Sequence, residues 1–139
     1  MIRPMHVVKF CALECGRQQS GELSVYRMCM AYNYALTMTK EHQFPTVNTI
    51  LELGRLVEPV INVNGFRTTP VTINYVPVPV IDFERVLGLY CKAWDRMIAR
   101  EHYGQFEAIH PFKDGNGRVG AILYNWHHLD TPSIPPEFE

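Results

Sequence analysis

The sequence predicts a mainly helical fold with one short β-hairpin. Several stretches repeat apolar residues at the 3.6-residue spacing of a helix, one stretch alternates at the two-residue spacing of strands, and turn-forming residues separate them. The 139 residues, 47% hydrophobic and 19% charged, suffice for one core without a disulfide or a metal. We expect a single domain over residues 1–139, with a helical part over 1–43 and an irregular tail over 130–139.

The first clear helical pattern covers Glu22–Lys40. Ser20 or Ser24 would cap its N-terminus by accepting hydrogen bonds from free backbone N–H groups. The residues expected on its apolar face are Val25, Met28, Cys29, Tyr32, Ala35 and Leu36.

A second helix is predicted over Val47–Val57, with Thr46 as its cap and Pro45 just before it. Its apolar set is Val47, Ile50, Leu51 and Leu53. Glu58-Pro59 should end this helix, because the residue before a proline is pushed away from helical angles.

The stretch Val60–Tyr75 changes to the strand period. Its alternating residues are Phe66, Thr68, Val71, Ile73 and Tyr75, and Asn64-Gly65 and Thr69-Pro70 are its breakers. We expect a short hairpin here, at the edge of any sheet because Pro70 lacks an N–H. The following Val76–Val80, with two prolines, is expected to be an extended connector.

Three further helices are predicted in the C-terminal half. The first is capped by Asp82 and runs to about Arg100, the next covers Glu101–Ile109, and the last covers Arg118–His128. The first of them should turn Val86, Leu89, Tyr90, Ala93, Trp94 and Met97 inward. Three prolines make Thr131–Glu139 irregular.

Composition argues against nucleic acid and membrane partners. The sequence has 13 Lys and Arg residues and 14 Asp and Glu residues, so the net charge is −1. The composition therefore does not predict the basic surface with which proteins attract nucleic-acid phosphates. No apolar run approaches the roughly 20 residues that span a bilayer. Met1–Leu13 has too short an apolar segment for a secretory signal, so we expect a cytoplasmic protein.

The cysteines are Cys11, Cys15, Cys29 and Cys91, and no two of them form a CxxC pair. Zinc sites usually show tighter ligand pairs. We expect small buried or partly buried thiols in a reducing cytoplasm, with a metal site or a disulfide as the alternative.

The loop His110–Arg118 carries residues that packing alone does not explain. Glycines flank an asparagine just before a helical pattern, so successive backbone N–H groups can cradle an anion at the helix N-terminus. Arg118 can bind a phosphate, Asp114 is an oxygen ligand suited to Mg²⁺, and His110 can take a proton near neutral pH. Each residue alone has an ordinary turn or packing explanation, but together they suit phosphoryl or nucleotidyl transfer.

HPFKDGNGR at 110–118 resembles the signature of the Fic (Fido) family, HPFx(D/E)GN(G/K)R, at every fixed position. Phe106–Ile109 resembles the FExI that leads into this motif, and Gly65–Ile73 looks like the family's flap hairpin. The resemblance covers about residues 44–128 and implies a Fic-type helical bundle. Small Fic proteins of this kind are often carried by phages, in which case the cytoplasm is that of the host.

The resemblance also implies a function. Fic enzymes generally transfer AMP from ATP to a Ser, Thr or Tyr hydroxyl of a target protein. Position by position, it makes His110 the base, Asp114 the Mg²⁺ ligand, Gly115, Asn116 and Gly117 the anion hole, and Arg118 the β-phosphate ligand. It makes Gly65, Phe66, Arg67, Thr68, Val71 and Ile73 a flap to which an extended target segment adds as a strand.

Two departures keep alternatives open. Ala121 stands where the family's fuller signature has a second arginine, so the group moved could instead be UMP, phosphocholine or phosphate. A catalytically silent scaffold that binds nucleotide or target is the remaining alternative. The inhibitory (S/T)xxxE(G/N) motif has no clean copy: Glu14 is the candidate, and Glu137 follows two prolines that forbid a regular helix.

Overall fold

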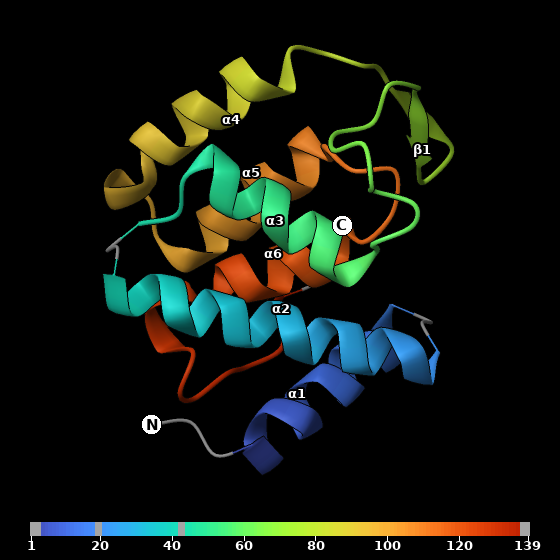
Figure 1. The fold of residues 1–139 in the computed structure, drawn as a ribbon. Coiled ribbons are helices and arrows are strands. Elements are labelled where there is room, and N and C mark those ends of the chain that lie inside the picture. Colours follow the sequence, from blue (N-terminus) through green and yellow to red (C-terminus); the bar gives the residue numbers. More distant parts are fainter. Residues whose placement is uncertain (1–3, 19–20, 42–43, 137–139) are drawn as a thin grey trace.

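A buried helix, α6 (Asn116–Tyr124), lies inside the fold, and α1, α2, α3 and α5 all contact it (Figure 1). The structure is a computed structural model that describes residues 4–18, 21–41 and 44–136. Seven of the nine residues of α6 are buried, which is the pattern of a helix packed on every side. The loop that precedes α6 is therefore anchored to the core at its C-terminal end.

The described elements confirm a mainly helical fold with one hairpin. In chain order they are α1 (Pro4–Arg17), α2 (Glu22–Glu41), α3 (Val47–Val57), β1 (Val71–Ile73), β2 (Val76–Val78), α4 (Phe83–Lys92), the 3-10 helix η1 (Trp94–Arg96), α5 (Ala99–Ile109), α6, and the 3-10 helix η2 (Trp126–His128). None of these helices is long and apolar enough to cross a membrane.

Helices α2 and α3 confirm the first two predictions. α3 spans the predicted residues, the Thr46 hydroxyl accepts a hydrogen bond from the Thr49 amide at 3.2 Å, and Glu58 ends the helix. In α2 the fully buried residues are Met28, Ala31, Tyr32 and Ala35, whereas Val25, Cys29 and Leu36 are only partly buried. Ser24 lies inside the first turn of α2, and Ser20 lies outside the described residues.

The cysteines are free thiols, as expected. Cys11 and Cys15 are buried where α1 packs on α2, and Cys29 and Cys91 are partly buried. Burial raises the pKa of the Cys91 thiol to about 12, so this group stays protonated at neutral pH.

The hairpin exists, but its predicted position was wrong. β1 pairs antiparallel with β2, so Val76–Val78 is a strand and not a connector. Asn74 and Tyr75 form the turn, both with positive φ (48° and 65°), which suits a two-residue turn between twisted strands. A two-stranded ribbon has two outer edges, so Pro77 is tolerated in β2 with its nitrogen toward one of them.

The helix predicted from Asp82 to Arg100 was wrong in its second half. Asp82 does cap α4 by accepting from the Arg85 amide at 3.1 Å, but α4 ends at Lys92. The chain then turns at Trp94, whose ring stacks on His102 at 3.5 Å and whose carbonyl lies 2.8 Å from the His102 Nε2. These contacts with His102, together with the hydrogen bond from the Trp94 Nε1 to His127 at 3.2 Å, outweigh the helical pattern of the sequence.

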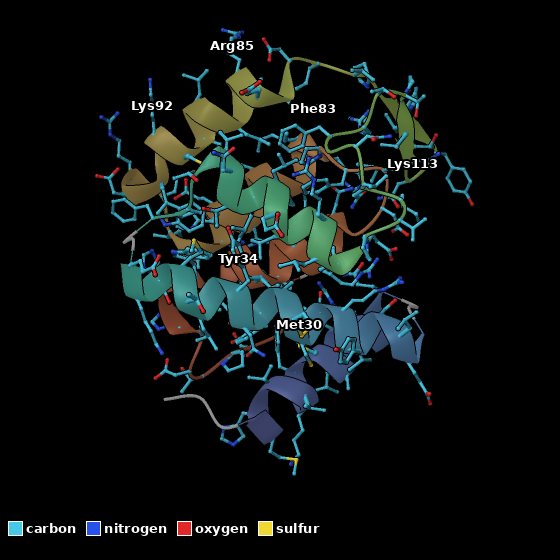
Figure 2. The ribbon with its side chains drawn as sticks, viewed as in Figure 1. Met30, Tyr34, Phe83, Arg85, Lys92 and Lys113 are labelled. Atoms are coloured by element: carbon cyan, nitrogen blue, oxygen red, sulfur yellow. The ribbon has the colours of Figure 1, made fainter. Side chains whose placement is uncertain are left out.

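The break also changes which residues face the core. Tyr90 and Trp94 are buried as predicted, but Leu89, expected inside, is 55% exposed, and α4 buries Phe83 and Leu87 in addition. Figure 2 shows Arg85 and Lys92 pointing away from the helical bundle.

The last predicted helix is shorter than expected. α6 begins at Asn116 and ends at Tyr124, and η2 follows as a separate turn. The described tail, residues 131–136, is irregular as predicted, and Asn125 holds it through two hydrogen bonds of 2.9 Å with the Ser133 backbone.

Gly54 in α3 gives the loop before α6 its anchor. The ring of Phe112 is fully buried and lies so close to Gly54 that a Cβ on Gly54 would be 2.2 Å from the ring. We predict that Gly54→Ala destabilises the protein by about 1–3 kcal/mol, because overpacking outweighs the better helix propensity of alanine. Urea unfolding measures this change.

Gly88 in α4 supplies the matched control, since a Cβ there would meet nothing within 4 Å. Gly88→Ala should leave stability unchanged or raise it by up to about 1 kcal/mol. Equal stability changes for the two variants would mean that Phe112 does not depend on the missing Cβ of Gly54.

Candidate active site

The loop between α5 and α6 begins at His110, which ends α5 in a left-handed conformation with φ of 50°. Its amide donates to the Phe106 carbonyl at 2.9 Å, and its own carbonyl accepts from the Arg67 Nε at 2.7 Å. These bonds hold a backbone conformation that a non-glycine residue rarely adopts. The sharp turn sends the chain out of α5 and into the motif loop.

The imidazole of His110 has a defined neutral form. Its Nδ1 lies 3.1 Å from the Glu107 carbonyl oxygen, which can only accept, so Nδ1 carries the proton and Nε2 is left as an acceptor. Burial lowers the pKa of His110, and the charge of Arg67 lowers it further, against the hydrogen bond to Glu107 that raises it. His110 is therefore neutral at pH 7 and able to accept a proton at Nε2.

Asn116 and Asn62 hold the loop in shape. Asn116 bonds the backbone of Phe112 twice, through Oδ1 to the amide at 2.9 Å and through Nδ2 to the carbonyl at 2.7 Å. Asn62 donates from Nδ2 to the carbonyls of Gly54 and Asp114, both at 2.9 Å. The loop is thus joined both to itself and to α3.

The start of α6 is the place where the sequence predicts an anion cradle. Gly115 caps the helix with φ of 88°, and a Cβ there would lie 2.7 Å from Val57. A Cβ on Gly117 would collide with the carboxamide of Gln18, which lies 2.3–2.6 Å from its position. Free backbone N–H groups and the helix dipole make such a terminus attractive to anions.

Arg118 is buried just below this helix start. Its guanidinium lies 2.8 Å from Glu58 and donates to the Val57 carbonyl at 3.2 Å. It also lies 3.6 Å from Asp114, whose side chain is 55% exposed. The guanidinium is fixed by these partners before any ligand arrives.

The motif loop and the start of α6 line one small pocket of about 160 Å³. The pocket is bounded by Gln18, Glu107, His110, Lys113, Asp114, Gly115, Asn116, Gly117 and Arg118. The structure therefore brings together the predicted base, metal ligand, cradle and arginine. A larger cavity of about 550 Å³ lies between α1, α2 and η2, and no predicted site residue lines it.

The donor set fits magnesium bound together with phosphates. Asp114 offers a largely exposed carboxylate at the pocket, with Oδ1 accepting from the Gly115 amide at 2.8 Å. Among the described residues no three His, Cys, Asp or Glu side chains are grouped to hold a metal. One carboxylate completed by phosphate oxygens and water is the usual arrangement for Mg²⁺.

The predicted flap residues divide into two groups. Val71 and Ile73 lie in β1, whereas Gly65, Phe66, Arg67 and Thr68 lie in the loop before it. Gly65 has φ of 100°, Phe66 packs on Phe112 with ring centroids 5.5 Å apart, and Thr68 is exposed. The expected span of the hairpin, Gly65–Ile73, was therefore wrong, because the pairing partner of β1 follows it in the chain.

Arg67 is buried rather than displayed to a target. Besides the His110 carbonyl, its guanidinium donates to the carbonyls of Thr69, Val78 and Pro79 at 2.9–3.2 Å. Its amide donates to the Pro111 carbonyl at 2.9 Å. This one side chain joins the hairpin to the loop that begins with His110.

Glu14, the candidate inhibitory residue, is fully buried on α1. Arg17 donates to it through Nε and Nη2 at 3.0 Å, and Gln18 donates through Nε2 at 3.0 Å. Glu14 does not line the pocket, but Gln18 does. Glu137 lies outside the described residues.

Sequence reasoning missed Gln18, Asn62, Glu58 and Lys113 as parts of this site. Glu107 was seen only as part of the FExI pattern. The contacts that bring Gln18, Asn62 and Glu58 to the loop join residues more than 45 positions apart. Lys113 stands inside the motif at its variable position, and it is exposed on the loop near the hairpin (Figure 2).

The sequence of the chain matches a known protein family. A sequence model described as the Fic/DOC family matches residues 44–127. No curated protein matches the chain. The matched region contains the hairpin and the motif loop, and α1, with Glu14 and Arg17, precedes it, as does Gln18 just after α1.

We predict that Arg67→Lys destabilises the protein by about 3 kcal/mol. An ammonium group cannot span the four carbonyls that the guanidinium serves, and each buried carbonyl left without a donor costs about 1–3 kcal/mol. Urea unfolding measures the loss, and faster proteolysis between residues 67 and 80 reports release of the hairpin.

Thr68→Ala is the control, because Thr68 is an exposed neighbour. It should change stability by less than about 0.5 kcal/mol. If Arg67→Lys were as mild as this control, the four carbonyls would not depend on the guanidinium.

Proposed function

The chain belongs to the Fic/DOC family of transferases that move AMP or similar groups, and from this premise we propose that it transfers AMP from ATP to a hydroxyl side chain of a target protein. One observation carries the proposal. A neutral His110, whose Nε2 can accept a proton, lines the same small pocket as Asp114, Arg118 and the first residues of α6. A base beside a phosphate site is the arrangement that nucleotidyl transfer needs.

His110 acts as the base in this proposal. Nε2 takes the proton of the target hydroxyl as the hydroxyl oxygen attacks the α-phosphorus of ATP. A bond forms between that oxygen and phosphorus, the bond to the bridging oxygen breaks, and pyrophosphate leaves with the electron pair. The hydrogen bond from Nδ1 to the Glu107 carbonyl stabilises the imidazolium that results.

The phosphates are held by α6 and its loop. Gly115, Asn116 and Gly117 surround the α-phosphate, with the amides of Asn116 and Gly117 as donors because the Gly115 amide already donates to Asp114. Arg118 meets the β-phosphate with its geometry already set by Glu58. When bound, Mg²⁺ supplies charge neutralisation of the phosphate oxygens, and the residue that holds it is Asp114. Preset donors stabilise charge that develops during transfer without having to reorganise.

The target protein binds at the hairpin. β1 has an outer edge in the two-stranded ribbon, and an extended segment can pair with it as a third strand. Arg67 fixes the distance between this edge and His110, because it bonds the hairpin and the His110 carbonyl together. Main-chain pairing selects an extended shape more than a particular side chain.

Ala121 supports a second candidate, the transfer of another phosphate-containing group such as UMP, phosphocholine or phosphate. This position is fully buried in α6 and provides no cation to a terminal phosphate. Of these groups, phosphocholine would come from a donor without a triphosphate, which would lose nothing from this absence. A scaffold that binds nucleotide without turnover is the remaining alternative.

The deciding experiment incubates the protein, Mg²⁺ and a host lysate with ATP labelled at either the α- or the γ-phosphate. We expect protein-bound α-label, and we expect His110→Ala to lower its rate by about 10²–10⁴-fold because the base is lost. The variant should keep its fold and its affinity for ATP, measured by circular dichroism and calorimetry.

The other outcomes separate the alternatives. Label from the γ-phosphate alone would show phosphorylation instead, and neither label despite ATP binding would show a silent scaffold. Full activity of His110→Ala would remove His110 from the mechanism.

The pH dependence of the transfer should also follow His110. Since burial lowers its pKa, the neutral, active form persists below the usual histidine range. We predict an acidic limb of kcat/KM with a midpoint below about pH 6.5. A midpoint clearly above that value in a steady-state pH profile would contradict the assignment.

A further inference from the structure

Glu107 reaches the phosphate pocket from α5, one helical turn before His110. Its Oε1 is shielded from solvent and has no hydrogen-bond partner among the described residues. The backbone of α6 closes in on this oxygen, because a Cβ on Gly120 would lie 3.0 Å from it. Glu107 is only partly buried as a residue, but a shielded carboxylate oxygen without a hydrogen-bond partner is costly, so this oxygen calls for an explanation.

The surrounding charges do not balance an ionised Glu107. From α1, Arg17 faces it, but the guanidinium is already committed to Glu14 and to the Tyr103 hydroxyl, each at 3.0 Å. Glu14 adds a second negative charge from the same helix. Burial raises the pKa of Glu107 to about 7, Arg17 lowers it and Glu14 raises it.

Other titratable and charged groups also border the pocket. They are Tyr103 and His110 on α5, Lys113 and Asp114 in the loop, and Arg118 on α6. Arg118 is paired with Glu58 and Asp114, and His110 is neutral at pH 7. The pocket thus holds two carboxyl groups where a polyanionic ligand has to bind.

We propose that Glu107 is a phosphate-binding residue that acts in its protonated form, so that the nucleotide binds together with one proton. The inference rests on the proposed function, because it assumes that phosphates enter this pocket. An ionised Glu107 would repel them, whereas a neutral carboxyl group donates its O–H to a phosphate oxygen. The proton comes from solvent when the ligand binds and returns to it when the ligand leaves.

The proposal has a quantitative consequence. Above the pKa of the free Glu107, each pH unit lowers the affinity for Mg·ATP by up to about tenfold, because the proton has to be taken up first. At pH 7.5 a free pKa of about 7 means that about three quarters of a proton is taken up for each ATP bound.

The test compares the wild type with Glu107→Gln, which keeps the shape but cannot titrate. Calorimetry with Mg·ATP at pH 7.5, in buffers of different ionisation enthalpy, counts the protons taken up on binding. Protons that belong to ATP and to His110 occur in both proteins and cancel in the difference. We expect the wild type to take up about 0.75 proton more than Glu107→Gln, whose affinity should stay nearly level between pH 7 and 8.5.

Glu84→Gln is the matched control, since Glu84 is exposed on α4 and lies outside the pocket. It should take up as many protons as the wild type. Equal proton uptake by Glu107→Gln and the wild type would overturn the inference and leave the proposed function standing. Failure of the wild type to bind Mg·ATP at any of these pH values would overturn both.

A second measurement needs no variant and covers the case in which Glu107→Gln does not fold. The carboxyl ¹³C resonance of Glu107 in the wild type is followed by NMR at pH 7.5 as Mg·ATP is added. We expect it to move from the ionised toward the protonated position. A resonance that stays ionised in the saturated complex would refute the proposal.

Discussion

The site depends on the buried guanidinium of Arg67. Four carbonyl oxygens from three separate segments, the His110 turn, Thr69 before β1 and the end of the hairpin, converge on it. Within residues 4–18, 21–41 and 44–136, no carboxylate forms an ion pair with it. The Phe83 ring beneath it, 4.8 Å from the guanidinium carbon, completes its surroundings. Because the same group bonds both the backbone of His110 and the hairpin, His110 and the edge of β1 that we propose for target binding are held in a fixed relation. Its positive charge also helps to keep His110 neutral.

The second constraint is that the charged guanidinium of Arg118, in the first turn of α6, is buried. Arg118 is only 3% exposed, and a lone guanidinium there would be costly. Glu58 provides the countercharge from the end of α3, the helix that also accommodates Phe112 at Gly54. α3 therefore both packs the loop and sets the charge of its arginine. The remaining partner, Asp114, is exposed enough to bind a metal without breaking the pair of Arg118 with Glu58.

The sequence was sufficient where local chemistry decides the structure. Thr46 caps α3, and the motif from His110 to Arg118 forms a loop at one pocket. The sequence was insufficient where contacts with other segments of the chain determine where a helix ends or which strands pair. Trp94 lies outside α4 because His102 and His127 contact it. Strand β2 was missed because Pro77 and Pro79 suggested an extended connector, and periodicity does not show pairing across the Asn74–Tyr75 turn. The structural role of Arg67 was missed for the same reason: its four hydrogen-bond acceptors are backbone carbonyls, which a pattern of side chains does not predict.

The contribution of α1 decides what an inhibitory role for Glu14 would require. Its carboxylate accepts hydrogen bonds from Arg17 in α1 and from Gln18 just after it, and Ala121 offers no charged partner from α6. Glu14 therefore touches the pocket only through Gln18. The carboxamide of Gln18 lies against Gly117 at the start of α6, and the hydrogen bond to Glu14 holds it there. In this arrangement Glu14 positions a residue that lines the pocket and does not itself line it.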